Sequence, residues 1–343
     1  MRVIIGVDPH KRSHTAVAID QKEKELARVE VRASKRQLDQ LRKWAGPYAQ
    51  RTWAIESASG LGYLLAQQLV AAGEHVVDVP PTLASRVRLL GTGQTNKNDP
   101  NDSRSVAIAA LRSPGLASVR SADHSAVLRL LAKRNLDLAR ERNRVACRLH
   151  ALLCELVAGG ISKEMSTFKA ERLLEGVQAE TPVETTRVSL ALELIEDLVR
   201  LDEQLKEMRR RISDALAASK TGLTDLFGVG PIVACLVIGY SGDIGRFETR
   251  SRYATYNGTA PIEMSSGGRI THRLSRRGNR TLNYAIHIAA VAQIRHAHSE
   301  GRAYFDRKLA GGKTKKEALR SLKRRVSDAI YQQLVLDAER RRA

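Results

Sequence analysis

The sequence predicts an α/β domain at the N-terminus, a central arm of long helices and a mostly α-helical C-terminal domain. Short apolar segments with strand-like patterning alternate with helical segments up to about residue 118. Apolar residues then recur at helical spacing, with few glycines and prolines, up to about residue 218. The last part combines glycine-containing turns with apolar and basic helical stretches. We therefore expect domains at residues 1–118, 119–218 and 219–343.

The expected sheet begins with three strands joined by short turns, and alternating helices and strands follow. The first strand, RVIIGVD, is almost continuously apolar, which is typical of a central buried strand. The later elements are expected in this order: the strands TAVAI and ELARVEVRA, a helix from about Ser34 to Trp44, the strand RTWAIES, a helix closed by Gly73, the strand HVVDV, the basic connection SRVRLLGTGQTNKN, and a helix from Asp99. This order predicts an α/β layer and argues against a solenoid or a helical bundle.

Two long helices are expected between about Ser121 and Ala218. The stretches LRLLAKRNLDLARERNRVACRLHALLCELV and LALELIEDLVRLDEQLKEMRRRISDAL repeat apolar residues at helical spacing, with charged residues between them. An irregular joint is expected from about Gly159 to Pro182. The pattern predicts an antiparallel or intermolecular coiled-coil-like arm, whose commonest role would be spacing or dimerisation.

The C-terminal domain opens with a segment that resembles a helix-hairpin-helix. In LFGVGPIVACLVIGYSGDIGRF, Gly228 and Gly230 flank a valine between two helical stretches. Glycines in such a hairpin let backbone amides approach a phosphate closely, although a tight helix–helix connection has the same pattern. We expect residues 253–281 to form a glycine- and arginine-rich loop, followed by an apolar helix and a final basic helix.

The charge of the chain favours a polyanionic partner, with nucleic acid as the first candidate. The 57 Lys and Arg residues exceed the 37 Asp and Glu residues by 20, and the isoelectric point is near 10.3. Between Ser241 and Ala343 there are 22 basic and 9 acidic residues, a net charge of +13. This segment should therefore carry much of the phosphate contact. Aromatic residues make up only 4% of the chain, which argues against base stacking as the main mode of recognition.

The sequence also predicts a cytoplasmic protein with no membrane partner. No run approaches the roughly 18 apolar residues of a membrane span, and the first residues lack the pattern of a signal peptide. Three cysteines, Cys147, Cys154 and Cys235, lack the spacing of metal or redox motifs. We expect them to be buried packing residues.

Four acidic residues occur where an RNase H-like sheet gathers its metal ligands. Asp8 ends the apolar strand VIIGVD, Glu56 ends TWAIE, and Asp99 and Asp102 lie three positions apart at a helix start. In such a sheet these positions meet at one edge, where two divalent ions can be held for in-line attack on a phosphodiester. Oxygen ligands without clustered His or Cys favour Mg2+ or Mn2+. In a second interpretation, Asp99 only caps the helix that begins at Pro100.

Six short motifs occur in the order and spacing of a known family. They are IGVDPHK, IES, NDPNDS, GVGP, APIEMSSGG and RRGNRTL. Together they resemble the DEDD transposases of the insertion-sequence 110/1111 family, and the similarity covers nearly the whole chain. The resemblance implies a RuvC-like N-terminal domain in which the four acids named above bind the metal ions, and a C-terminal transposase domain with a catalytic serine.

The family's catalytic serine matches Ser266, because the family pattern places it directly before a glycine. Ser265 is the alternative. Without the resemblance, SSGG would read as a polar loop. Chemically, a nucleophile that attacks a phosphodiester needs a flexible turn and nearby cations to stabilise charge at phosphorus. Gly267 and Gly268 supply the turn, and arginines that could stabilise that charge and bind nucleic acid follow: Arg269, Arg273, Arg276, Arg277 and Arg280.

The preferred function is a DNA transposase that cuts and rejoins strands through a Mg2+-assisted serine nucleophile. The resemblance implies that a structured non-coding guide RNA, the bridge RNA, pairs with donor and target DNA. It also implies a homodimer that assembles to a tetramer. We expect a composite active site, with the acids in the N-terminal domain and the serine in the C-terminal one. The first alternative is a RuvC-like junction-resolving nuclease that uses metal and water without a covalent intermediate. The second is a non-catalytic nucleic-acid scaffold, which the four carboxylates argue against.

Overall fold

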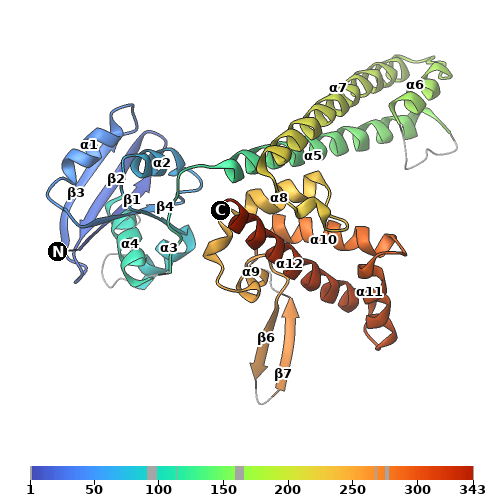
Figure 1. The fold of residues 1–343 in the computed structure, drawn as a ribbon. Coiled ribbons are helices and arrows are strands. Elements are labelled where there is room, and N and C mark those ends of the chain that lie inside the picture. The colour runs from blue at the N-terminus through green and yellow to red at the C-terminus, as the bar shows by residue number, and fades with distance from the viewer. Residues whose placement is uncertain are drawn as a thin grey trace. The chain divides into compact units, whose positions relative to one another are not determined.

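The computed structural model describes residues 2–90, 99–113, 115–158, 166–266, 269–274 and 278–342. The chain forms two compact units, Met1–Ala122 and Asp123–Ala343 (Figure 1). The first contains the expected α/β domain. The second contains the helical arm together with the C-terminal region. Over the described ranges, no helix is long and apolar enough to cross a membrane.

A five-stranded mixed sheet forms the centre of the N-terminal unit. The strand order is β3-β2-β1-β4-β5; β1, β2 and β3 are antiparallel neighbours, and β4 and β5 continue the sheet in parallel. Its elements are β1 (Val3–Pro9), β2 (Ser13–Ile19), β3 (Glu25–Arg32), α1 (Gln37–Trp44), β4 (Arg51–Glu56), α2 (Tyr63–Ala71), β5 (Val76–Val79), α3 (Pro81–Leu90) and α4 (Asp99–Arg112). The predicted α/β layer is confirmed, with the most apolar strand in the middle.

One expected connection proves to be partly helical. The segment from Ser85 to Leu90, assigned above to a basic connection, is the second half of α3. The reason is the spacing of Leu83, Ala84 and Val87, which pack against the sheet core from one side of a helix. The basic residues of the segment therefore lie on a regular element.

Both faces of the sheet are buried, which explains the continuous apolar pattern of β1. Successive side chains of a strand point to opposite faces. Val3, Ile5 and Val7 join a core with residues of α1 and α2, whereas Ile4 joins a second core with residues such as Val106 of α4. A strand buried on both faces cannot alternate apolar with polar residues.

Helix α4 packs directly on the central strands because residue 6 of β1 is glycine. A Cβ atom on Gly6 would lie 2.5 Å from the amide nitrogen of Ala107 and closer still to the carbonyl oxygen of Ser103. The Ser103 hydroxyl donates a 2.9 Å hydrogen bond to the carbonyl oxygen of Thr15 on β2. The missing side chain and this bond together fix α4 against β1 and β2.

Glu74 anchors the opposite end of the sheet, before β5. Its carboxylate accepts hydrogen bonds from Arg51 Nε at 2.8 Å and from Trp53 Nε1 at 3.0 Å. The hydrogen bonds from Arg51 are the main reason that the pKa of Glu74 lies below its ordinary value. The start of β4 is thus held by charge-assisted bonds, whereas its other end carries Glu56.

The second unit is mostly helical. Its elements are α5 (His124–Leu156), α6 (Thr167–Glu175), α7 (Pro182–Ser219), η1 (Leu223–Asp225), α8 (Pro231–Ser241), η2 (Ile244–Arg246), α9 (Arg250–Tyr256), β6 (Pro261–Ser266), β7 (Arg269–Leu274), α10 (Arg280–Arg295), α11 (Glu300–Ala310) and α12 (Lys315–Arg340). The two predicted long helices, α5 and α7, are present and pack on each other within one chain (Figure 1). Thr181 and Glu184 form a capping box that begins α7.

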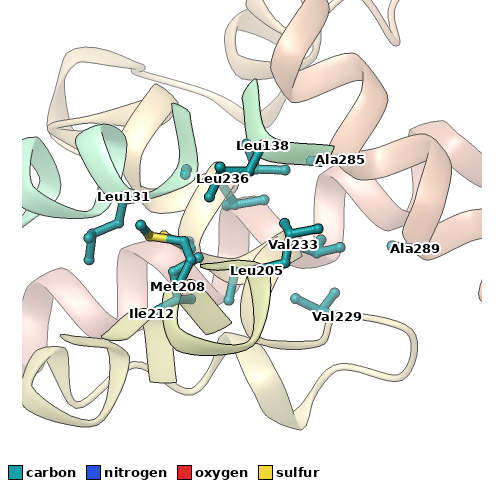
Figure 2. Close-up of a cluster of buried hydrophobic side chains, with 14 of the residues drawn as sticks. Leu131, Leu138, Leu205, Met208, Ile212, Val229, Val233, Leu236, Ala285 and Ala289 are labelled. Carbon is teal, nitrogen blue, oxygen red and sulfur yellow. The ribbon is translucent and has the colours of Figure 1, made fainter. Parts of the chain in front are cut away.

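One continuous core joins the arm to the other helices of this unit. Figure 2 shows Leu131 of α5 and Met208 of α7 in the same cluster as Leu236 of α8 and Ala285 of α10. Helix α8 crosses α5 closely, because a Cβ atom on Gly239 would lie 2.6 Å from the Cα atom of Arg129. The base of the arm therefore belongs to the same folded unit as the C-terminal helices.

The expected glycine- and arginine-rich loop is partly regular structure. Residues 250–256 form α9, and β6 and β7 form an antiparallel hairpin in which Ser266 pairs with Arg269. The strands hydrogen-bond to each other, and two glycines separate them.

Two of the three cysteines are exposed, contrary to the prediction of buried packing residues. Cys147 and Cys154 lie on the solvent side of α5, whereas Leu149 and Leu153 face the arm core. Only Cys235, on α8, is buried, and burial raises the pKa of its thiol to about 12. Cys147 and Cys154 are exposed because they lie on the side of α5 opposite to Leu149 and Leu153.

We predict that Gly6→Ala destabilises the N-terminal unit by about 1–3 kcal/mol, the usual cost of overpacking a core, because α4 must move away from β1. Urea unfolding followed by circular dichroism measures this change. The matched control is Gly115→Ala, since a Cβ atom at Gly115 meets nothing within 4 Å. Equal stability of the Gly6 variant and the wild type would contradict the close packing of α4.

Candidate active site

Asp8 and Glu56 come from neighbouring strands and point to the same face of the sheet. Strands β1 and β4 are parallel and Val7 pairs with Ile55, so the next positions, Asp8 and Glu56, are side by side. Val7 and Ile55 belong to the core on the side of α1 and α2. By alternation, the two acids point to the other face, on which α4 lies.

Asp102 joins these two acids from the first turn of α4. Burial raises the pKa of Glu56 above its ordinary value, and the negative charges of Asp8 and Asp102 raise it further. The three carboxylates are therefore close enough to repel one another. The ordered acids of the sequence converge here because Gly6 and Ser103 hold α4 on β1 and β2.

Two basic side chains accompany the carboxylates. Arg88 of α3 donates a short hydrogen bond from Nη1 to Oδ1 of Asp102, and both side chains are largely buried. The Nε2 atom of His10, just after β1, lies 3.2 Å from Oδ2 of Asp8. The charges of Arg88 and His10 act to lower the pKa of Glu56, against the larger effects of burial and repulsion. Neither Arg88 nor His10 belongs to the acids that the sequence pattern indicated.

The turn after β4 fixes the backbone next to Glu56. Ser57 has a φ of 51°, a left-handed conformation that is uncommon for a residue with a side chain. The Oδ1 atom of Asp78 on β5 accepts a 2.8 Å hydrogen bond from the amide of Ala58. A Cβ atom on Gly62 would lie 2.6 Å from Cγ2 of Ile55, so the chain passes closely over the strand end. These contacts hold Glu56 at a defined position on the edge of the sheet.

The fourth predicted acid, Asp99, begins α4, and its side chain lies outside the described ones. Among the side chains that the structure describes, no group of three or more His, Cys, Asp or Glu has the spacing of a metal site. Asp102 is instead held by Arg88. The charges of Asp8 and Asp102 both act on Glu56, and a hard divalent cation bound by these oxygen donors would offset that repulsion. Binding of such a cation here remains a prediction.

The predicted nucleophile lies on the β6–β7 hairpin of the second unit. Ser266 is the last residue of β6, and Ser265 precedes it in the same strand. The side chains of both serines and of Arg269 and Arg273 lie outside the described ones. Arg276 and Arg277 also lie outside the described residues. Arg280, the first residue of α10, is exposed.

The GVGP segment lies between the short turn η1 and helix α8. Gly228 has a φ of +83°, and a Cβ atom there would lie 2.6 Å from the carbonyl oxygen of Ala289 on α10. This glycine is therefore required by backbone conformation and by packing. Gly230 is the N-cap residue of α8, and a Cβ atom on it would meet nothing within 4 Å. A helix-hairpin-helix role in phosphate binding remains a prediction.

Comparisons with protein families place both units in one family. The IS110-type DEDD model, described as a transposase, matches residues 5–157, and the model described as "Transposase IS116/IS110/IS902 family" matches residues 221–306. The chain belongs to the IS110/IS116 transposase family. The first match in this transposase covers the sheet with its acids and α5, and the second covers α8 to α10, including the hairpin with Ser266.

Similar proteins include other products of insertion elements. The transposase is 26% identical to "Insertion element IS116 uncharacterized 44.8 kDa protein" of Streptomyces clavuligerus, over 97% of this chain and 94% of that protein. It is 29% identical to "Probable family 20 transposase" of Pseudomonas aeruginosa, over 58% of this chain and 60% of that one. A solved structure, RuvC of Thermus thermophilus in complex with Holliday junction substrate, matches 35% of this chain and all of its own, at 11% identity and a TM-score of 0.29.

In this transposase, Asp8 and Arg88 act on the pKa of Glu56 in opposite directions, which gives a test of the arrangement. We predict that Asp8→Asn lowers the pKa of Glu56 and that Arg88→Gln raises it, because the first change removes a repelling charge and the second an attracting one. NMR titration of 13C-labelled glutamate carboxyls in chelator-treated protein measures both shifts. The matched control is Arg86→Gln, an exposed arginine on the same helix. Shifts of the same sign in the two variants would contradict the arrangement.

Proposed function

We propose that this transposase cuts and rejoins DNA strands through the hydroxyl of Ser266, assisted by Mg2+ or Mn2+ held by Asp8, Glu56, Asp102 and Asp99. The observation that carries the proposal is the convergence of three coupled carboxylates on one sheet edge. The family match gives the reaction class. The resemblance to the family motifs supplies the role of the serine.

The carboxylates would hold the divalent ions in place of their present basic partners. Bound ions would make the phosphodiester more electrophilic and balance its charge. Arg88 would then release Asp102, and its guanidinium would become available for a phosphate oxygen. Burial and the charges of Asp8 and Asp102 raise the pKa of Glu56, and a bound cation would lower it.

The serine would exchange one phosphoester bond for another. Its oxygen forms a bond to phosphorus as the hydroxyl proton passes to water, and the bond from phosphorus to a sugar oxygen breaks. That sugar oxygen takes up a proton from water and leaves as a hydroxyl group. A sugar hydroxyl of the second DNA molecule then attacks the phosphoserine and releases the enzyme. No phosphoester bond is lost to water, so strand exchange needs no other energy source.

The nucleic-acid partners follow from charge and family. A net charge of +20, of which +13 lies in the last part of the chain, suits donor and target DNA. We further propose that an element-encoded guide RNA selects these DNA sites by base pairing, with the protein contacting backbones. Sequencing of RNA that copurifies with the protein tests this part.

The same architecture also suits the alternative function, a metal-dependent nuclease that resolves DNA junctions with water as the nucleophile.

The two units each contain one half of the proposed site, and a dimer would bring the halves of two chains together. Apolar side chains remain exposed along the arm. Leu192 and Val199 of α7 are 45% and 42% exposed and lie seven residues apart, on one side of the helix. We propose that this side contacts a second copy, with the tetramer formed from two such dimers.

We predict that incubation with cleavable DNA and Mg2+ yields a covalent protein–DNA adduct, which denaturing gels detect. Ser266→Ala should abolish the adduct because no hydroxyl remains to attack phosphorus. Asp102→Asn should abolish it because the metal site loses a charge, while DNA affinity stays within a few fold, since distant basic residues dominate phosphate binding.

The control is Ser265→Ala, which should retain the adduct. If Ser265→Ala abolishes the adduct and Ser266→Ala does not, the nucleophile is Ser265. Strand cleavage by the wild type without any adduct would favour the nuclease that uses water.

For the arm, we predict that the double variant Leu192→Glu, Val199→Glu converts a dimer into a monomer, as measured by multi-angle light scattering. Buried carboxylates without partners would destabilise the interface. Leu336→Glu on α12 is the matched control, because its side chain is 47% exposed outside the arm. An unchanged oligomeric state of the double variant would contradict the proposed interface.

A further inference from the structure

Three basic side chains meet along the seam between α10 and α12. Arg280 and His287 lie on α10, and Lys323 lies on α12, which packs against it. Burial and, to a smaller extent, the charge of Arg280 together lower the pKa of Lys323 to about 8. The pKa of His287 is lowered by burial and by the charge of Lys323. Within the described residues, no carboxylate contributes to either shift.

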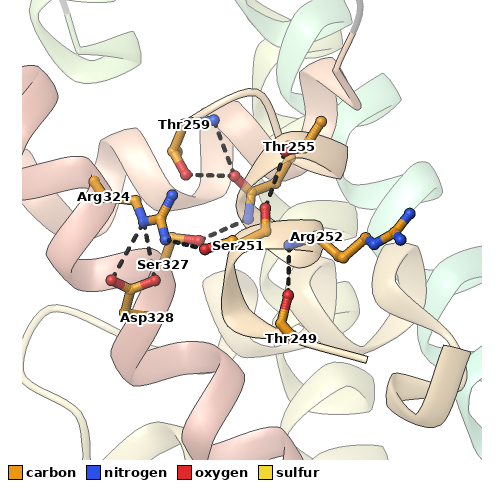
Figure 3. A network of polar contacts seen from close by, with 9 residues as sticks. Thr249, Ser251, Arg252, Thr255, Thr259, Arg324, Ser327 and Asp328 are labelled. Atoms are coloured by element: carbon orange, nitrogen blue, oxygen red, sulfur yellow. Dashed lines mark hydrogen bonds and ion pairs between the residues drawn. The ribbon is translucent and has the colours of Figure 1, made fainter. Parts of the chain in front are cut away.

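The ammonium group of Lys323 is held at a fixed position by a chain of hydrogen bonds. Its Nζ atom donates to Oδ1 of Asn283 at 2.7 Å, and Nδ2 of Asn283 donates to the carbonyl oxygen of Asn257 at 2.9 Å. The fully buried Asn257 donates in turn to the hydroxyl of Ser327 on α12 at 2.7 Å. Figure 3 shows Ser327 in this network, beside Thr259, whose amide and hydroxyl both donate to Asn257.

The neighbouring arginine of α12 is engaged elsewhere. Nε of Arg324 donates to both carboxylate oxygens of Asp328, at 3.0 and 3.3 Å, and Nη2 donates to the hydroxyl of Ser251 at 3.2 Å (Figure 3). The acid on this part of α12 therefore neutralises Arg324. The charges of Arg280 and Lys323 remain together in the seam.

The same network secures both ends of the hairpin that bears Ser266. Asn257 and Thr259 precede β6, and Asn279, whose side chain caps α10, follows β7. The two ends cross closely, because a Cβ atom on Gly278 would lie 2.5 Å from the amide nitrogen of Gly258. Through Asn283 and Asn257, Lys323 is therefore connected to the base of the hairpin.

We propose that Arg280, Lys323 and His287 form a binding site for one phosphodiester group of a nucleic-acid backbone. The inference rests on the proposed function, which supplies the nucleic acid. Two adjacent cations in a partly buried seam repel each other, and a phosphate oxygen anion between them would replace that repulsion with charge-assisted hydrogen bonds. Two of the three ammonium protons of Lys323 are left for the ligand once Asn283 is bound.

The bound group is distinct from the phosphodiester that is cut. Ser266 lies five strand residues beyond Pro261, or about 17 Å along the hairpin at the usual rise of a strand. Backbone phosphates follow one another at about 3.4 Å of axial rise per nucleotide in a duplex strand. A phosphate held in the seam, at the base of the hairpin, is therefore a different phosphate from the one attacked at Ser266.

The test is the affinity of the full-length protein for a DNA duplex and for an RNA duplex of equal length, by fluorescence anisotropy over a range of salt concentrations. We predict that Lys323→Gln lowers the affinity about eightfold at 0.1 M salt and reduces the slope of log affinity against log salt by about one, the effect of one lost phosphate contact. The loss with DNA alone would assign the site to donor or target, and the loss with RNA alone would assign it to the guide.

The matched control is Lys315→Gln, which removes the same charge from an exposed position of the same helix. Equal losses in the two variants, or no loss in Lys323→Gln, would overturn the inference. Thermal unfolding is used to check that each variant is folded.

Arg280→Gln gives an independent test. If both side chains hold one phosphate, the double variant Arg280→Gln, Lys323→Gln should lose less affinity than the product of the two single losses. Absence of binding by the wild type would instead refute the proposed function.

A pH titration adds a second signature. Bound phosphate favours charged Lys323 and raises its pKa above the free value of about 8. The affinity of the wild type should therefore be complete below pH 8 and decline as the pH rises above it, and Lys323→Gln should lack this decline. His287 titrates below this range because its pKa is lowered. Guanidinium groups in general keep their charge at these pH values. A decline of equal size in the variant would overturn the assignment to Lys323.

Discussion

The close packing of α4 against β1 is the contact on which the candidate active site depends. It exists because a side chain is missing: any Cβ at Gly6 would meet the backbone of Ser103 and Ala107. The acid on α4 thereby reaches the edge where two parallel strands end with Asp8 and Glu56. A helix held further from the sheet would leave the same residues unable to influence one another.

At this edge of the sheet, the negative charges of Asp8 and Asp102 lie close enough to Glu56 to disfavour its ionised form. Burial and neighbouring charges raise the pKa of Glu56, while Arg88 and His10 reduce the repulsion in part. A salt bridge such as Arg88–Asp102 gives the carboxylate a partner without filling all of its lone pairs. Arg88 and His10 thus offset only part of the effect of burial and like charge on Glu56.

The sheet and the meeting of the acids could be predicted because they follow from local pattern. VIIGVD and TWAIE are apolar strands, and parallel neighbours bring their ends to one edge. The pairing of Arg88 with Asp102 could not be predicted, since it depends on how α3 packs on α4. The hairpin around Ser266 was missed because its two six-residue strands have few apolar residues and flank a pair of glycines, a pattern that is typical of a loop. The exposure of Cys147 and Cys154 follows from the phase of α5, which the apolar residues Leu149 and Leu153 already indicate.

The hairpin extends from a base that is fixed by several contacts along a ladder of six paired positions. Asn257, Gly258 and Gly278 lock the base, whereas the ladder from Pro261 with Leu274 to Ser266 with Arg269 sets the reach. Side chains alternate along such a ladder, so inserting one residue in each strand would turn the serine to the opposite face. Inserting two in each would keep the face and extend the reach by about 7 Å. Engineered changes in the reach of the hairpin that keep the serine on its present face are therefore limited to even numbers of residues in each strand.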